Sequence, residues 1–155
     1  MKKILLARIS CYLYFLFLSV TVYGQENRLA PQQPNSAEIY QQLQKLGFLG
    51  TALYLAAHPD DENTRALAWL SNGEHAQTAY FSLTRGDGGQ NLIGNELGAA
   101  LGLLRSQELL AARKIDGAKQ YFSRAVDFGY SKSAEESLNK WGKEEILADA
   151  VKIIR

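Results

Sequence analysis

A histidine followed closely by three acidic residues is the feature of this sequence with the clearest chemical potential: residues 58–62 read His-Pro-Asp-Asp-Glu. Neighbouring carboxylates repel one another, by about 4 kcal/mol at ~4 Å and an effective dielectric constant of ~20, so something must compensate. One possibility is that Asp60, Asp61 and Glu62 lie over the N-terminus of a following helix, where each acid is worth roughly 0.3–1 kcal/mol. That explanation leaves His58 without a role.

A divalent metal ion is the second possibility. A turn brings residues i and i+3 to within ~7 Å of each other, so His58 and Asp61 could bind one ion. Asp60, which lies between them, would then point elsewhere, toward a metal-bound water. A nitrogen ligand and a carboxylate ligand beside an open position are typical of catalytic zinc. The spacing alone is equally compatible with the metal site and with the helix cap.

A second polar segment, residues 85–91 (Arg-Gly-Asp-Gly-Gly-Gln-Asn), combines flexible backbone with both signs of charge. It lacks the Gly-x-x-x-x-Gly-Lys pattern of a phosphate-binding loop, and it lacks the third glycine of the dinucleotide-binding pattern. Nucleotide binding is therefore a weak alternative, which would require phosphate contacts to residues 86–89. A surface loop whose glycines adopt positive φ would explain the glycines, but not their place in the chain.

The elements expected to position these segments alternate between strands and helices. Apolar runs predict three parallel strands, over residues 51–57, 76–84 and 119–123. The first run is continuous, which is typical of a strand covered on both faces. Apolar residues at helical spacing predict helices over residues 36–47, 62–71, 96–115 and 143–155.

This alternation predicts an α/β fold, a Rossmann-like three-layer parallel sheet with flanking helices. Ligands of such sheets bind at the carboxyl ends of the strands. We therefore expect the chemistry just after Ala57 and just after Thr84, where the two polar segments begin.

The first residues indicate export rather than a folded segment. Residues 1–24 combine basic Lys2, Lys3 and Arg8 with an apolar run over 9–22 and a small residue at the expected cleavage site, as in a secretory signal peptide. The apolar run is shorter than the roughly 20 residues that span a membrane. The polar residues 25–35 indicate a linker. We therefore expect an exported protein, periplasmic or extracellular, with no membrane span after signal cleavage.

The composition of the whole chain limits what the protein can do. The 155 residues are 46% hydrophobic and 21% charged, which is typical of one folded domain and excludes a disordered chain. Seventeen basic against sixteen acidic residues give a net charge of +1, which argues against nucleic acid as a partner. The single cysteine, Cys11, lies in the predicted signal peptide, so the mature chain has neither a disulfide framework nor a cysteine-rich zinc module.

Three motifs in a fixed order carry a family resemblance. Residues 57–62 (Ala-His-Pro-Asp-Asp-Glu) end the first strand, residues 84–89 (Thr-Arg-Gly-Asp-Gly-Gly) end the second, and the pattern Arg105-x-x-Glu108-x-x-x-Ala112 lies in the next long helix. From about residue 39 onward, the chain resembles the PIG-L/LmbE-like deacetylases, metal hydrolases that remove acetyl groups from N-acetylglucosamine-type sugars. Residues 127–130 (Asp-Phe-Gly-Tyr) and the leader are similar to exported bacterial members.

The resemblance implies a catalytic centre in the first motif. His58 and Asp61 would be ligands of one zinc ion. Asp60 would be the general base that takes a proton from the metal-bound water, and the resulting hydroxide would attack the amide carbonyl. The products would be acetate and a free amino sugar.

The resemblance also implies a substrate side. Arg105 matches a position that the family uses there, and Arg85 and Asp87 are further candidates for binding an N-acetylated amino sugar or glycoconjugate. An ion pair between Arg105 and Glu108, three residues apart on one helix, explains that arginine equally well.

A third zinc ligand is missing from this pattern. Catalytic zinc usually has three protein ligands, and the family supplies the third from a histidine-rich segment farther along the chain. The other histidine here, His75, precedes the second strand, so we expect it at the opposite edge of the sheet, on the surface. Residues 36–155 are therefore expected to be the N-terminal portion of a deacetylase domain, incomplete at the C-terminus and missing its C-terminal half. The alternative is a non-catalytic remnant or carbohydrate-binding module of the same fold, which would retain no zinc.

Overall fold

The structure, a computed structural model, describes residues 33–155 of the chain. The chain divides into two units, Met1–Ala37 and Glu38–Arg155. The predicted signal peptide and most of the predicted linker lie outside the described residues. Of the first unit, the structure describes residues 33–37, in which irregular chain leads into helix α2 (Ser36–Leu46). The second unit contains the whole of the described sheet.

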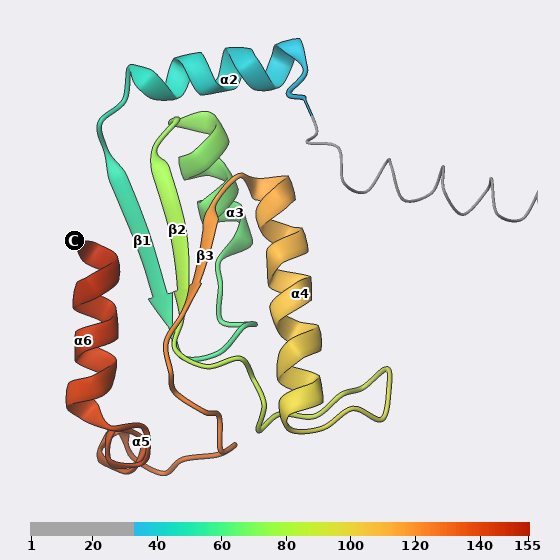
Figure 1. Ribbon diagram of the computed structural model, residues 1–155, viewed down its shortest axis with the longest axis vertical. Coiled ribbons are helices and arrows are strands. Elements are labelled where there is room, and N and C mark those ends of the chain that lie inside the picture. The colour runs from blue at the N-terminus through green and yellow to red at the C-terminus, as the bar shows by residue number, and fades with distance from the viewer. Residues whose placement is uncertain (1–32) are drawn as a thin grey trace, which may run out of the picture. The chain divides into compact units, whose positions relative to one another are not determined.

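The described sheet has three parallel strands in the order β1-β2-β3 (Figure 1). These strands are β1 (Thr51–Ala56), β2 (Gln77–Ser82) and β3 (Lys119–Phe122). The central strand β2 is buried along almost its whole length, whereas Leu55 in β1 is half exposed. The expectation that β1 is covered on both faces is therefore wrong. Its apolar run is continuous, but β1 lies at an edge of the described sheet and β2 takes the central place.

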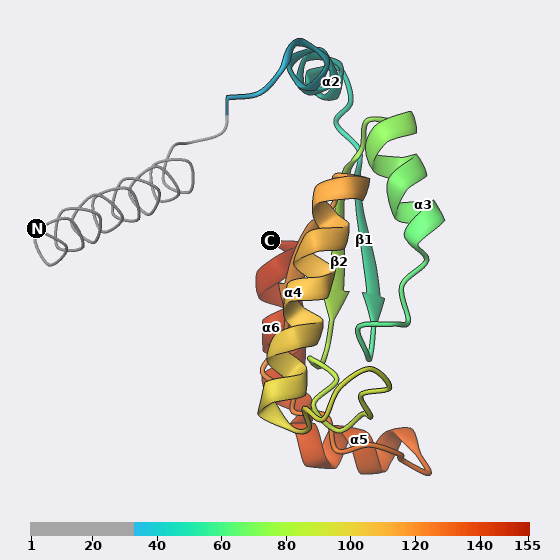
Figure 2. The ribbon, with the colours of Figure 1, turned by 90° about the vertical axis from the view of Figure 1, so that its right-hand side faces the viewer.

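Helices cover both faces of this sheet and give three layers. The chain crosses from β1 to β2 through α3 (Thr64–Ala68) and a π-helical turn, η1 (Trp69–Gly73), and from β2 to β3 through α4 (Ala99–Asp116). After β3 come α5 (Ala134–Trp141) and α6 (Lys143–Ile154). Figures 1 and 2 together place α3 and α4 on one face of the sheet and α6 on the other. The predicted three-layer α/β architecture is confirmed.

The core under α3 and α4 is built around a tyrosine of the central strand. Tyr80 is fully buried and packs with Leu67 of α3, Leu109 of α4 and Ala118, next to the ring of Tyr54 at a centroid distance of 5.9 Å. Burial of these side chains holds both helices against the sheet through the hydrophobic effect. A buried tyrosine hydroxyl usually has a hydrogen-bond partner. The Tyr80 hydroxyl donates to the carbonyl oxygen of His58, in the turn that follows β1.

The helix ends follow local capping chemistry. The Asn63 side chain accepts a hydrogen bond from the amide of Ala66 at 3.0 Å, so α3 begins after the acidic residues rather than at residue 62 as predicted. Helix α4 starts three residues later than predicted and ends at Asp116, one residue beyond the predicted range, where Gly117 adopts a left-handed conformation (φ 76°) and donates its amide to the carbonyl of Arg113. The short helix α5 was not predicted. It starts where Ser133 accepts a hydrogen bond from the Glu136 amide at 3.2 Å.

Helix α2 agrees with its predicted range, but its apolar stripe is not buried in the described structure. Ile39, Leu43 and Leu46 recur on one face, and all three are exposed. None of the helices within residues 33–155 is both long enough and apolar enough to cross a membrane.

Candidate active site

A tight turn follows β1 and brings the two predicted metal ligands together. The amide of Asp61 donates to the carbonyl oxygen of His58 at 3.3 Å, which closes the turn between positions i and i+3. The same carbonyl accepts a hydrogen bond from the buried Tyr80 hydroxyl. Oδ2 of Asp61 accepts from the His58 amide at 2.9 Å and lies 3.3 Å from Nδ1 of the His58 ring. The two side chains therefore face one another at the carboxyl end of the first strand.

The three acidic residues of the turn have different environments, and none of them caps a helix. Asp61 faces His58, whereas Glu62 points inward to the buried guanidinium of Arg113. Asp60 is 73% exposed, and its Oδ2 lies 3.7 Å from Nη1 of Arg105. Helix α3 has no acidic residue in its first turn, so the helix-cap explanation of this segment is wrong.

A further carboxylate, which sequence reasoning missed, reaches the other side of the imidazole. Oδ1 of Asp127 lies 3.7 Å from Nε2 of His58, and the Asp127 side chain is almost completely buried. The same oxygen accepts a hydrogen bond from the amide of Gly129 at 2.9 Å. Asp127 comes shortly after β3, as His58 comes shortly after β1, so both lie at the carboxyl edge of the sheet. That position in the chain was the signal that could have identified it.

Gly88 lets the loops after β2 and β3 approach closely at this edge. A Cβ atom at Gly88 would overlap the backbone of Asp127 and Gly129, so this contact requires glycine. The indole nitrogen of Trp141 in α5 donates to the carbonyl of Val126 at 2.9 Å. The loop that carries Asp127 is thus held from two sides.

The donor atoms of His58 and Asp61 fit two positions of a tetrahedral ion. Bonds of about 2.0–2.2 Å to a zinc ion place two ligand atoms roughly 3.3–3.5 Å apart, and the observed separation of Nδ1 and Oδ2 is 3.3 Å. An imidazole nitrogen and a carboxylate oxygen are also the donor types that zinc accepts. Within residues 33–155, no three His, Cys, Asp or Glu side chains are arranged around one point as a complete metal site.

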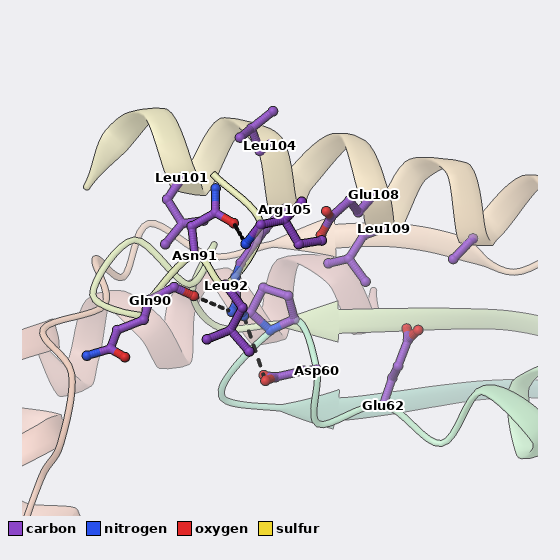
Figure 3. Close-up of a pocket in the computed structure, with 13 residues that line it drawn as sticks. Asp60, Glu62, Gln90, Asn91, Leu92, Leu101, Leu104, Arg105, Glu108 and Leu109 are labelled. Carbon is purple, nitrogen blue, oxygen red and sulfur yellow. Dashed lines mark hydrogen bonds and ion pairs between the residues drawn. The ribbon is translucent and has the colours of Figure 1, made fainter. Parts of the chain in front are cut away.

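A cleft of about 410 Å³ opens beside the turn (Figure 3). At its polar end, Asp60 and Arg105 point toward one another, and Nη2 of Arg105 also lies 3.5 Å from the carbonyl oxygen of Gln90. Its apolar wall is formed mainly by Pro59, Leu92, Ile93, Leu101, Leu104 and Leu109. The ion pair that Arg105 forms is with Asp60 of the turn, not with Glu108 as the alternative explanation required.

The other two predicted substrate-side residues line a separate hollow. Arg85 and Asp87 face a depression of about 530 Å³ that also includes Asp127. The Arg85 guanidinium lies over the ring of Phe122, 5.1 Å from its centroid. The Asp87 carboxylate sits so close to Gly102 of α4 that a Cβ atom there would overlap it. The structure therefore brings Asp60 and Arg105 together and places Arg85 and Asp87 on a different side of the turn.

The second histidine is not part of this site. His75 lies just before β2, at the amino end of the sheet, as predicted from its position in the sequence. It is partly buried rather than at the surface, adopts a left-handed backbone conformation (φ 59°), and its Nδ1 has no hydrogen-bond partner among the residues that the structure describes.

Comparison with known proteins agrees with this geometry. Residues 53–155 match the family model PIG-L, described as GlcNAc-PI de-N-acetylase, and the match includes the turn, the glycine-rich loop and helix α4. It begins within β1 rather than near residue 39. No curated protein shows a significant match to the chain. The matched region covers well over half of the sequence and contains His58, Asp60, Asp61 and Arg105, so the chain belongs to the PIG-L family of metal-dependent deacetylases that act on N-acetylated sugars.

Proposed function

We propose that this protein is a zinc-dependent hydrolase that removes the acetyl group from an N-acetylglucosamine-type sugar. The observation that carries the proposal is the pairing of His58 Nδ1 with Asp61 Oδ2 at 3.3 Å, in the same turn as the exposed carboxylate of Asp60. Two donors that fit an ion and a carboxylate in the same turn are groups that metal-assisted hydrolysis of an amide uses. Family membership supports the class of substrate.

The metal position is assigned to His58 and Asp61. A zinc ion held there would polarise the amide carbonyl and lower the pKa of a bound water to ~7. The protein's own part begins with Asp60, whose carboxylate is exposed at the cleft and accepts the proton of the attacking water. The C–N bond of the acetamide breaks, the acetyl group leaves as acetate, and the nitrogen takes up a proton to become the free amine.

The cleft supports binding of an amphipathic sugar ring. Arg105 offers guanidinium donors to hydroxyl groups at the polar end, next to Asp60. Leu101 and Leu104 of α4 offer an apolar wall to the less polar face of the ring. Arg105 therefore orients the substrate so that its acetamide lies near the turn.

We also propose that the protein acts after export. The basic start and the apolar run of residues 1–24 support a secretory signal, and residues 25–35 support a linker to the catalytic region, residues 36–155. The substrate would then be an N-acetylated sugar or glycoconjugate outside the cytoplasm, and cleavage at the predicted site would be visible as a new N-terminus in the secreted protein.

The test uses the full chain, loaded with zinc and dialysed. Bound zinc is measured by elemental analysis, and acetate release is measured with N-acetylglucosamine and its β-glycosides. We expect His58→Asn to lose both bound zinc and acetate release. The matched variant His75→Asn changes the same residue type at the other end of the sheet and should retain both. Acetate release by His58→Asn at the wild-type rate would refute the proposal.

A carbohydrate-binding module without catalysis is the second candidate function. It is favoured by one specific observation: within residues 33–155 the turn presents two close metal donors, whereas catalytic zinc usually has three protein ligands. This alternative predicts that the chain binds N-acetylglucosamine in a calorimeter, retains no zinc after dialysis and releases no acetate.

A further inference from the structure

A buried arginine lies beneath the functional turn. Arg113, in the last turn of α4, is only 5% exposed at its side chain. Its guanidinium pairs with Asp116, with distances of 3.0 Å from Nε and 2.6 Å from Nη2 to Oδ2. Its Nη1 donates to Glu62, the last residue of the acidic turn, and to Oε1 of Gln120 at 3.1 Å. Arg113 of α4 therefore holds Glu62, which is distant from it in the sequence and directly follows Asp61.

Opposite charges face one another in this cluster. The side chains of Glu62 and Asp116 are 12% and 3% exposed, so both carboxylates depend on the guanidinium for compensation. Burial by itself lowers the pKa of Arg113, but the bonds to Glu62 and Asp116 outweigh that effect and raise the pKa above its usual value. Arg113, Glu62 and Asp116 are therefore held in place by one another in the protein interior.

The Arg113 guanidinium also contacts Tyr80, which in turn contacts His58, the first residue of the turn. It lies over Tyr80, 5.6 Å from the ring centroid, and the Tyr80 hydroxyl donates to the carbonyl oxygen of His58. Tyr80 is completely buried and cannot shift without disturbing the core. Two lines of contact thus lead from Arg113 to the turn: one through Glu62 to Asp61, and one through Tyr80 to His58.

The turn needs such support because its reactive side chains are open to solvent. His58 and Asp61 are 38% and 46% exposed at their side chains, so packing alone does not fix their rotamers. A loss of about 1 Å in their alignment would separate two donor atoms that now lie 3.3 Å apart.

We propose that Arg113 is a positioning residue for the His58–Asp61 pair, acting through Glu62 and Tyr80 rather than by touching substrate or metal. The zinc and rate consequences rest on the function proposed above, whereas the effect on the geometry of the turn does not. The competing explanation is that Arg113 only stabilises the fold.

Three variants of the full chain separate these explanations. Arg113→Lys keeps the charge but offers a single ammonium group in place of the planar fork, so it cannot make the same set of bonds to Glu62, Asp116 and Gln120. Glu62→Gln keeps the size of the side chain and removes its charge. Asp116→Asn weakens the other carboxylate partner, which does not contact the turn.

A matched control tests the chemistry of the substitution itself. Arg124→Lys makes the same exchange in another arginine–aspartate pair, between the segment after β3 and Asp149 of α6, where Nη2 and Oδ1 are 2.7 Å apart. Any effect shared by Arg113→Lys and Arg124→Lys reflects loss of an ion pair in general and not a role at the turn.

Two readouts report on the turn without relying on activity. The first is zinc affinity, measured by competition with a chromogenic chelator. The second is the nitrogen-15 spectrum of the His58 ring in metal-free protein, recorded in a His75→Asn background so that one imidazole remains. Thermal unfolding of each variant measures the effect on the fold separately.

We expect Arg113→Lys and Glu62→Gln to weaken zinc binding about tenfold or more and to shift the His58 ring signals. Asp116→Asn and Arg124→Lys should change the melting temperature but leave zinc affinity within about twofold of the wild type. If Arg113→Lys does not fold, Glu62→Gln and Tyr80→Phe carry the same comparison, since both break a contact to the turn and leave Arg113 in place.

The proposal is overturned if Glu62→Gln and Tyr80→Phe keep both the wild-type zinc affinity and the wild-type His58 spectrum. If the wild-type protein binds zinc but releases no acetate, the proposed hydrolase function fails while the positioning role is still decided by affinity and spectrum. If the wild type binds no zinc, the His58 spectrum alone decides it.

Discussion

The imidazole of His58 lies between two carboxylates, with Asp61 3.3 Å from Nδ1 and Asp127 3.7 Å from Nε2. If Nδ1 and Asp61 hold a zinc ion, the remaining ring proton is on Nε2 and faces the buried carboxylate of Asp127. A carboxylate behind a histidine ligand fixes the orientation of the ring and strengthens the ligand, and Asp127 lies where it can do this.

We therefore predict that Asp127→Asn lowers zinc affinity about 10–100-fold, because the neutral amide is a weaker partner for the Nε2 proton of a zinc-bound imidazole. Chelator competition measures the affinity, and long-range nitrogen-15 spectra of zinc-loaded protein report on the environment of Nε2. Asp87→Asn, a matched change in the same hollow, should leave both unaltered. Wild-type affinity in Asp127→Asn would show that Asp127 does not support the ligand.

Asp60 is predicted to be needed for a high kcat and not for zinc binding. Its carboxylate is exposed and faces Arg105, and it takes no part in the pairing of His58 with Asp61. Asp60→Asn should lower kcat by about 10²–10⁴-fold, as expected for loss of a general base, while bound zinc stays at the wild-type ratio. Glu108→Gln, on the same cleft wall, is the control and should change kcat little. Loss of zinc from Asp60→Asn would instead make this residue a ligand.

Much of the fold could be predicted because its signals are local. The runs of apolar residues identify all three strands of the described sheet, and α4 ends at Gly117, within one residue of the predicted end. Helix α5 was not predicted because it is only 8 residues long and its start depends on one hydrogen bond from the Glu136 amide to Ser133. Which strand is central is not a local property, so the burial of β1 was predicted wrongly.

The contacts of the site are likewise either local, and predictable from the sequence, or long-range, and not predictable from it. The proximity of His58 and Asp61 follows from a four-residue turn, and the sequence is sufficient to predict it. The contacts of Asp127 with His58 and of Arg113 with Glu62 join residues from different strands and helices, and no spacing rule relates such pairs. Only the order of the strands in the sheet brings their loops to one edge.

Gly102 is predicted to set the position of the Asp87 side chain in the loop after β2. In most helices Gly→Ala gains roughly 1 kcal/mol of stability. Here the new Cβ would overlap the end of the Asp87 side chain, which has to turn away, so Gly102→Ala should gain less than this or destabilise the protein slightly. Urea unfolding measures the change. In an Asp87→Ala background the overlap is removed, and Gly102→Ala should become more favourable. The full gain in the wild-type background would mean that the loop moves freely away from α4.

The contact between Arg124 and Asp149 predicts a specific acid dependence of stability. Hydrogen bonds and attraction from Arg124 lower the pKa of Asp149 from 3.8 to about 2. Because the carboxylate is ionised more readily in the folded state, the pair stabilises the fold above the unfolded-state pKa of about 3.9. This contribution is lost as the pH falls from about 4 toward 2. The melting temperatures of wild type and Asp149→Asn should therefore differ by a constant amount between about pH 5 and 7 and converge near pH 2. In an Arg124→Gln background the difference should be small at every pH, and a gap that persists unchanged at pH ~2 would exclude Arg124 as its cause.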